Sequence, residues 1–206
     1  MTDPSEVDER PGDTTDEEYT RRLIAISDKP WKKLLHVQAP YQWDLRRLKL
    51  GRCLEVGCGI GRNLVSLPGG VGVDHNEYSV AECRRRGFEA YTVEEFFGRV
   101  DLTRPGSYDS LLASHLVEHV PRADLDDILG MYTPLVKKGG RFVFITPQEK
   151  GHASDPTHLG FTDFDVLADV ALAHGAVPIR QYSYPFPRWA GTLFVYNEFH
   201  LVARKG

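Results

Sequence analysis

Two histidines and a glutamate stand close together in the segment SHLVEHV. His115, Glu118 and His119 are spaced at i, i+3 and i+4, so one helical turn would place their side chains on a common face. Such a group can bind a divalent metal ion, or His119 can act as a general base beside Glu118. A third interpretation is a polar turn in which Glu118 and His119 orient the following helix.

A metal site would need further ligands. The segment TPQEKGHASDPTHLGFTDFD offers His152, Asp155 and His158. It follows the apolar run RFVFIT, which is typical of a buried strand, whereas SHLVEHV follows the strand-like run YDSLLA. Because parallel strands end at one edge of a sheet, we expect both segments to lie at the same edge.

A glycine-rich segment, LEVGCGIGRN, follows an apolar run and provides Gly57, Gly59 and Gly61. Glycines allow a tight turn and a close approach of the backbone to a ligand. Asp74 ends the next strand-like run, GVGVD, thirteen residues after Gly61. An acid at that place can accept hydrogen bonds from ribose hydroxyls, so the two features together predict a nucleotide site.

The elements that must position these residues alternate between strand-like and helical patterns from Arg52 onward, which predicts an α/β fold with a mostly parallel sheet and helices on both faces. We expect LEVGCGIGRN to lead into a helix, and RADLDDILGMYTPLVKKGG to be helical. TDFDVLADVALAHG predicts an amphipathic helix with Gly175 as its C-cap. The β-rich runs VPIRQYSYPF and TLFVYNEFHLVAR have no helix between them, so the last strand should be antiparallel.

The composition of the chain predicts where its folded domain begins and which classes of partner and compartment it favours. Residues 1–18 are acidic and almost without apolar residues, which predicts a disordered tail before a domain over residues 19–206. Helices are expected from Asp16 to Ile26, with Thr15 as N-cap, and after Pro30 and Pro40. The net charge of -4 gives no reason to expect a nucleic-acid partner. The odd number of cysteines and the lack of a secretory signal or a membrane-spanning apolar run favour a cytoplasmic protein.

The glycine spacing, with Glu55 before it, resembles motif I of the class I S-adenosylmethionine (SAM)-dependent methyltransferases. The resemblance extends from about Tyr41 to the C-terminus and implies a Rossmann-like sheet of seven strands with an antiparallel last strand. It implies SAM as cofactor. The residues implied to bind it, from the loop and the strand ends, are Glu55, Gly57, Cys58, Gly59, Gly61, Asp74, His75, Glu94 and Ser114.

Within this set, Asp74 is expected at the ribose, with His75 or Asn76 beside the adenine. Many members of the family carry an acid at the end of the third strand, where Thr92 stands in this chain. Glu94 or Glu95 is the candidate substitute, and the alternative is that both are solvated residues of a first helical turn.

The histidine segments are similar to those of the small-RNA ribose 2′-O-methyltransferases, which use an E-x-x-E-H turn and a later histidine to hold a divalent ion. Here His115 replaces the first glutamate and His158 precedes LGFT. The resemblance therefore implies His115, Glu118, His119 and His158 as metal ligands. This nitrogen-rich set suits Zn²⁺, Fe²⁺, Mn²⁺ or Co²⁺ better than Mg²⁺.

The acceptor site is expected near aromatic residues. Tyr41 and Trp43, together with Arg188 and Trp189 of the C-terminal run, are the candidate substrate-binding residues. Several segments resemble small actinobacterial O-methyltransferases, some of which act on sugars, including methylated mannose polysaccharides. The hypothesis is therefore O-methylation of a hydroxyl of a small carbohydrate, a mannoside for example, or a related metabolite. The alternatives are a quinol, phenol or lipid acceptor, or a SAM-binding protein without turnover.

Overall fold

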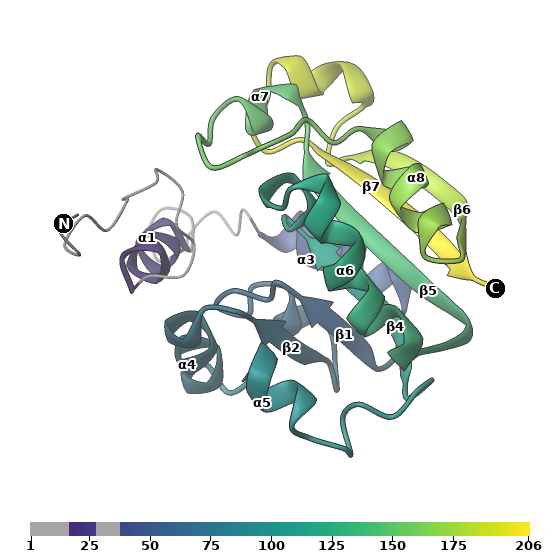
Figure 1. Cartoon of the computed structure of the whole chain (residues 1–206). Helices are drawn as coiled ribbons and strands as arrows, with labels where there is room; N and C mark the ends of the chain where they lie inside the picture. The colour runs from purple at the N-terminus through teal and green to yellow at the C-terminus, as the bar shows by residue number, and fades with distance from the viewer. Residues whose placement is uncertain (1–16, 28–37) are drawn as a thin grey trace, which may run out of the picture.

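The computed structural model describes residues 17–27 and 38–206. A sheet of seven strands runs through the molecule in the order β3-β2-β1-β4-β5-β7-β6 (Figure 1). Strands β1 to β5 pair in parallel, and β7 pairs antiparallel with β5 and β6. This confirms the predicted sheet and its antiparallel last strand. The strands are β1 (Cys53–Val56), β2 (Val71–Asp74), β3 (Glu89–Thr92), β4 (Tyr108–Ser114), β5 (Val136–Pro147), β6 (Ala176–Tyr184) and β7 (Glu198–Lys205).

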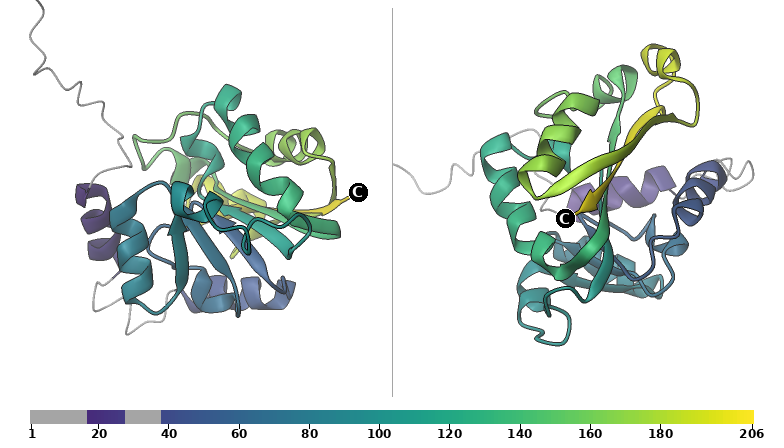
Figure 2. Two further views of the ribbon diagram at one scale, coloured as in Figure 1. Left: turned by 60° about the horizontal axis from the view of Figure 1, so that its bottom comes forward. Right: turned by 90° about the vertical axis from the view of Figure 1, so that its right-hand side faces the viewer.

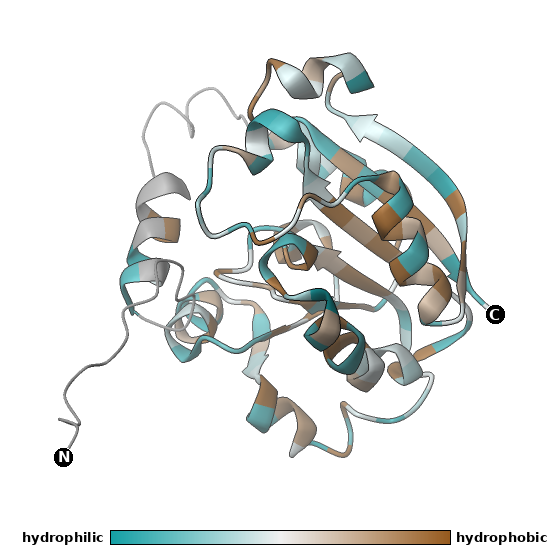
Figure 3. Cartoon of the chain, turned by 45° about the horizontal axis from the view of Figure 1, so that its top comes forward, coloured by the Kyte–Doolittle hydropathy of each residue, from teal (hydrophilic) through white to brown (hydrophobic). Residues whose placement is uncertain are grey.

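Helices cover both faces of the sheet (Figure 2). One apolar cluster joins the sheet to α5, α6 and α8, and a second joins the opposite face to α3 and α4. Apolar residues concentrate on the strands and on the inner sides of these helices (Figure 3). The helices are α1 (Glu17–Ser27), α3 (Ala39–Leu48), α4 (Glu77–Arg85), α5 (Val93–Phe97), α6 (Arg122–Tyr132), α7 (Glu149–His152) and α8 (Phe164–Ala173).

Local capping fixes where helices begin at the rim of the sheet. The Asn76 side chain accepts a hydrogen bond from the Ser79 amide, which starts α4 directly after β2. Thr92 and Glu95 form a capping box at the start of α5, directly after β3. Both helices therefore leave the sheet at the edge where the glycine loop lies.

Two predicted helices are wrong or too long. After the glycine loop the structure has only a short 3₁₀ turn, η1 (Leu64–Ser66), because Pro68 and the two glycines that follow it do not support a helix. The helix predicted from Arg122 ends at Tyr132, and Pro134 sits in the next 3₁₀ turn, η3 (Thr133–Leu135). The last residues of that predicted helix begin β5 instead.

The C-terminal β-rich run is also divided differently from the prediction. The 3₁₀ turn η4 (Arg188–Thr192) follows the first predicted β-rich run and ends at the first residue of the second, TLFVYNEFHLVAR, within which β7 begins only at Glu198. The predicted helix before Ile26 is present as α1. Residues 1–16 lie outside the described residues, and with them Thr15 and most of the predicted tail. The beginning of the helix expected after Pro30 also lies outside them. Across residues 17–27 and 38–206, none of the helices combines the length and apolar character needed to cross a bilayer.

Candidate active site

The glycine loop closes over the ends of β1 and β2. The Gly57 and Cys58 amides donate to the Val73 carbonyl, at 2.8 and 3.1 Å. Gly57, Gly59 and Gly61 all have positive φ, between 51° and 78°, a region that side chains other than glycine rarely enter. The loop therefore needs glycine at each of these positions.

The three glycines have different neighbours. A Cβ at Gly61 would lie 2.7 Å from Cys83 and Phe88, so this glycine permits packing against α4. At Gly57 it would meet Leu116 at 3.2 Å, and at Gly59 it would meet Leu23 of α1 at 3.6 Å. Gly57 and Gly59 therefore have side chains from the turn after β4 and from α1 as their nearest neighbours, and Gly57 is the tighter of the two.

Asp74 holds the loop from the end of β2. Its Oδ2 accepts from the Gly59 amide at 2.7 Å, and its Oδ1 accepts from the Asn76 amide at 2.9 Å. Each carboxylate oxygen can accept a second hydrogen bond, so Asp74 can shape the loop and still bind a ribose hydroxyl. His75 is exposed, with Nδ1 3.6 Å from Asp74 Oδ1.

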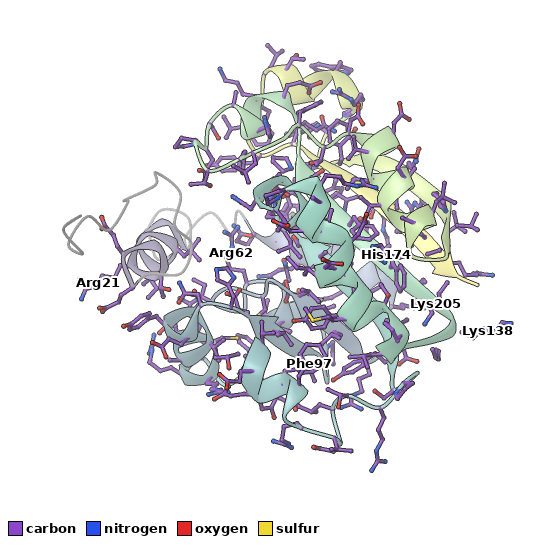
Figure 4. The ribbon with its side chains drawn as sticks, viewed as in Figure 1. Arg21, Arg62, Phe97, Lys138, His174 and Lys205 are labelled. Carbon is purple, nitrogen blue, oxygen red and sulfur yellow. The ribbon has the colours of Figure 1, made fainter. Side chains whose placement is uncertain are left out.

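Glu55 is almost fully buried, with 1% of its surface exposed, at the end of β1. Asn63 donates to its Oε1 at 2.7 Å, while its buried Oε2 lacks a hydrogen-bond partner in the described part of the chain. Burial raises the pKa of Glu55 to about 8, against the opposing hydrogen bond from Asn63 and the positive charge of Arg62. Arg62 extends from the loop toward the side of the molecule where α1 lies (Figure 4).

The remaining cofactor candidates contribute unequally. The Cys58 side chain is buried against Gly72 and Leu64, which leaves its backbone as the part that can meet a ligand. Glu94 is exposed in the first turn of α5, whereas Glu95 is committed to the capping box and to Arg84. Ser114 ends β4 and is 7% exposed.

The second part of the site is a cluster of Glu118, His119 and His158, which we call the histidine centre. One ligand atom from each side chain lies within 4.8 Å of the others. Glu118 and His119 belong to the 3₁₀ turn η2 (Val117–His119) after β4, and His158 comes from the loop after α7. The Leu159 amide donates to the Glu118 carbonyl at 2.8 Å and so fixes the two loops together.

Backbone carbonyls orient both imidazoles of the histidine centre. His158 Nδ1 lies 2.8 Å from the His152 carbonyl, and His119 Nδ1 lies 3.3 Å from the Thr157 carbonyl. A carbonyl only accepts, so these contacts place the ring proton on Nδ1 and leave the Nε2 lone pairs available. Glu118 Oε2 is buried and finds no hydrogen-bond partner in residues 17–27 and 38–206. Histidines that ligate a metal through one ring nitrogen typically make a hydrogen bond with the other, as the Nδ1 atoms of His119 and His158 do with backbone carbonyls.

The sequence predicted that His115, Glu118 and His119 share one face of a helical turn. In the structure His115 is not on a common helical face with the other two. It has φ 54° and lies between β4 and η2, outside the cluster of potential metal ligands. Its Nδ1 lies 3.1 Å from Glu118 Oε1 and its Nε2 lies 2.9 Å from Glu198 Oε1. Both ring nitrogens are therefore occupied by carboxylates.

These contacts continue into the interior. Glu198 Oε2 lies 3.0 Å from His200 Nε2, and His200 Nδ1 lies 3.2 Å from Asp44 Oδ2. We call Glu118, His115, Glu198, His200 and Asp44 the acid–imidazole row. Although burial opposes charge on His115, Glu198 and His200, the carboxylates raise the pKa of His115 to about 10 and raise that of His200, and the imidazoles lower the pKa of Glu198 to about 2. The contact with His200 and its charge also lower the pKa of Asp44, although burial opposes this, so the charges alternate from His115 to Asp44.

The candidate substrate residues lie in two places. The Tyr41 hydroxyl donates to the Tyr196 carbonyl at 2.7 Å, and Trp43 is 56% exposed beside Arg47. Arg188 pairs with Glu149 of α7, and Trp189 is 68% exposed on η4. Because His152 of α7 stacks on His158, η4 is joined to the histidine centre through α7.

The comparisons with known proteins agree with this geometry. The family model described as a methyltransferase domain matches residues 20–200. The chain belongs to the methyltransferase family. A SAM-dependent methyltransferase from Archaeoglobus fulgidus shares its fold, with a TM-score of 0.64 and 18% identity over 84% of this chain and 99% of that chain. Magnesium protoporphyrin IX methyltransferase from Synechocystis, solved with bound SAH, has a TM-score of 0.65 and 13% identity over 94% of this chain and 97% of that chain.

A third structure, a possible histamine N-methyltransferase from Thermotoga maritima, has a TM-score of 0.65 and 17% identity over 91% of this methyltransferase and 98% of that chain. No curated protein matches the sequence. The protein is a methyltransferase, and its residues fit SAM as the cofactor. The glycine loop offers a cradle without side chains, and the unpartnered Glu55 oxygen suits the ammonium group of the methionine part.

Sequence reasoning did not place Asp44, Glu198 or His200 beside the histidine segment; it named Glu198 only as a polar group of the acceptor pocket. A signal was available for Glu198, because an antiparallel strand that begins after a rim turn starts at the edge where parallel strands end. Glu198 pairs with Pro147, the last residue of β5, and His200 follows on the same face of β7. Asp44 gave no such signal, since its contact with His200 depends on how α3 packs.

Proposed function

We propose that this methyltransferase transfers the methyl group of SAM to a hydroxyl of a small carbohydrate, such as a mannoside, or of a related metabolite. In this proposal the histidine centre holds a divalent metal ion beside the acceptor. The observation that carries the proposal is the convergence of Glu118, His119 and His158 within 4.8 Å at the edge where the parallel strands end.

The donor atoms of the histidine centre fit a metal ion. Two Nε2 atoms with free lone pairs and one unpartnered carboxylate oxygen form a set that suits Zn²⁺, Fe²⁺, Mn²⁺ or Co²⁺. Three protein ligands leave coordination positions open. A metal ion at this place would lower the pKa of a bound hydroxyl and make it a better nucleophile. His115 is not among the proposed ligands, because carboxylates occupy both of its nitrogens.

General-base catalysis by His119 is a second candidate mechanism, supported by the electrostatics of its ring. Burial lowers the pKa of His119 below 6.5, outweighing the opposite effect of Glu118, so the ring is neutral at pH 7. Its Nε2 can then take the proton of the acceptor hydroxyl directly. Under this mechanism His158 would support His119 by contact, without a metal ion.

Carbohydrate as the acceptor class is supported by exposed aromatic rings around η4. Phe186, Trp189 and Tyr196 are each about half exposed or more, and Arg188 lies among them. Aromatic faces combined with a few polar groups bind sugar rings well. The same rings would also accept a flat quinol or phenol, which remains the rival acceptor class, as does a lipid intermediate.

His158→Ala tests the metal centre. We expect the purified variant to lose its bound metal and methyl transfer to fall by at least about 10-fold, while affinity for SAH stays unchanged. The measurements are metal content by mass spectrometry and SAH affinity by calorimetry. His174→Ala is the matched control, because His174 is a mostly buried histidine at the C-terminal end of α8 that lies 3.3 Å from Asp126.

Methyl transfer from tritiated SAM is then measured on a panel of mannosides, other sugars, quinols and phenols, before and after chelation. Chelator-sensitive transfer to a sugar supports the proposal. Transfer that is insensitive to chelators and retained in His158→Ala favours His119 as base. SAH binding without transfer to any acceptor indicates a protein that binds the cofactor without turnover.

A further inference from the structure

The acid–imidazole row differs at its two ends: the carboxylate at one end, which we call the closed end, has further partners, and the carboxylate at the other, the open end, has an oxygen without one. At the closed end Asp44 accepts a hydrogen bond from the Tyr182 hydroxyl at 2.6 Å and pairs with Arg47 at 2.5 Å. Along the row both oxygens of Glu198, both nitrogens of His115 and Nε2 of His200 have hydrogen-bond partners, whereas His200 Nδ1 approaches Asp44 at 3.2 Å as an ion pair without hydrogen-bond geometry. The open end is Glu118, whose carboxylate belongs to the histidine centre and whose buried Oε2 has no hydrogen-bond partner among the described residues.

The row joins three separate parts of the chain behind the histidine centre. Asp44 lies on α3, Glu198 and His200 lie on β7, and His115 lies in the turn after β4. Two of its contacts are local: His115 and Glu118 lie three residues apart, and Glu198 and His200 are neighbours on one face of β7. The contacts of His115 with Glu198 and of His200 with Asp44 exist only because tertiary packing brings these elements to one edge of the sheet.

Stability alone is a weak reason for such a row. Buried ion pairs contribute little compared with apolar side chains of similar size, because removing charges from water is costly. Asp44 and His200 are almost completely buried, and Glu198 is mostly buried. His115 in addition adopts a left-handed backbone conformation that glycine would adopt without strain. The histidine ring must therefore contribute something at this position that glycine could not.

We propose that His115, Glu198, His200 and Asp44 are positioning residues that act through Glu118. They hold Glu118 Oε1, so that Oε2 points toward His119 and His158. The proposal rests on the proposed function, in which Glu118 is a metal ligand, and it assigns His115 to a supporting role instead of a ligand role. Residues that orient a ligating side chain influence metal affinity strongly even without touching the metal.

Zn²⁺ affinity of the full chain, measured by competition with a chromophoric chelator, tests the row. We expect Glu198→Gln to weaken Zn²⁺ binding by about 10- to 100-fold, with unchanged SAH affinity. Asp44→Asn, one imidazole further away, should weaken it less. Glu82→Gln is the matched control, because Glu82 is also a mostly buried carboxylate between two cations, Arg85 and Arg86, on α4. It should leave Zn²⁺ affinity unchanged.

Thermal unfolding of each variant separates positioning from general destabilisation. If Zn²⁺ affinity follows the loss of stability, so that Glu82→Gln weakens it as much as Glu198→Gln, the positioning role is overturned. A crystal structure of Glu198→Gln gives a readout that needs no metal: Glu118 is expected to turn away from its wild-type position, and an unmoved Glu118 overturns the proposal. Failure of the wild-type protein to bind Zn²⁺ would instead contradict the proposed metal centre.

Discussion

At the scale of single residues, the candidate cofactor site contains a buried carboxyl group, Glu55, whose hydrogen bonding is incomplete among the described residues. Glu55 has one oxygen bound to Asn63 and one oxygen without a partner among the described residues. Burial raises its pKa to about 8, so in the absence of ligand the group is mostly protonated at pH 7. A positively charged ligand group beside it favours the carboxylate form.

This predicts that binding of SAH releases protons at pH 7. The ammonium group of the ligand would lower the pKa of Glu55, and the proton that it loses would pass to the buffer. Calorimetry in phosphate and in Tris measures the number of protons released, since the two buffers differ in ionisation enthalpy. Glu55→Gln cannot release this proton. Its heat of SAH binding should therefore be the same in phosphate and in Tris once the heat of dilution is subtracted. Equal proton release by wild type and variant would show that Glu55 is not the group involved.

The same shift affects stability. A carboxyl group whose pKa is higher in the folded state than in the unfolded state stabilises the fold below pH 4.5, and this contribution is lost as the pH rises through about 8. Glu55 was predictable as a cofactor residue from the motif around it. Its missing partner was not, because burial depends on the neighbouring strands.

At the scale of elements, the glycine loop is placed by backbone conformation and by the helix that packs under it. Gly61 has φ 78° and no room for a Cβ beside Cys83 and Phe88. Gly69 has nearly the same conformation, φ 69°, but open space around it. A comparison of Gly61 with Gly69 therefore separates the cost of a Cβ in the left-handed backbone conformation from the cost of its overlap with neighbouring side chains.

Gly69→Ala should lower the free energy of unfolding by about 1 to 2 kcal/mol, the cost of a left-handed residue with a Cβ. Gly61→Ala should lower it by about 1 to 3 kcal/mol more, because the methyl group overlaps the side chains of Cys83 on α4 and of Phe88 before β3. Urea unfolding of the two variants provides the comparison. Equal losses would mean that α4 moves away easily and does not hold the loop.

Element boundaries show where local patterns are insufficient. The prediction extended the helix from Arg122 past Pro134 because the apolar spacing continues, yet the chain turns there and enters β5. The helix expected after the glycine loop is reduced to η1 for a similar reason, the Pro68-Gly69-Gly70 sequence. Both errors came from giving periodicity more weight than proline and glycine.

At the scale of the whole molecule, the sheet separates two apolar cores. Val170 of α8 belongs to the cluster on one face, and Val80 of α4 belongs to the cluster on the other. Both side chains are almost completely buried. The two cores share the strands but no helix, so they should respond independently to substitution.

We therefore expect Val80→Ala and Val170→Ala each to lower the free energy of unfolding by about 1 to 3 kcal/mol through a small cavity. The double variant should lose the sum of the two values to within about 0.5 kcal/mol. Urea unfolding of the three variants measures this. A sum that deviates by more than 1 kcal/mol would indicate that the sheet transmits strain between its faces.

The sequence by itself determined the alternation of most strands and helices, the antiparallel last strand, and the glycine loop with Glu55 before it and Asp74 after it. These follow from local patterns, since apolar periodicity, glycine spacing and strand ends are properties of short segments. Tertiary structure alone decided which histidines meet. His158 joins Glu118 and His119, whereas His115 turns to Glu198, because β7 runs antiparallel and brings its first residue to the edge where β4 and β5 end. Contacts between distant segments depend on register and packing, which short segments do not encode on their own.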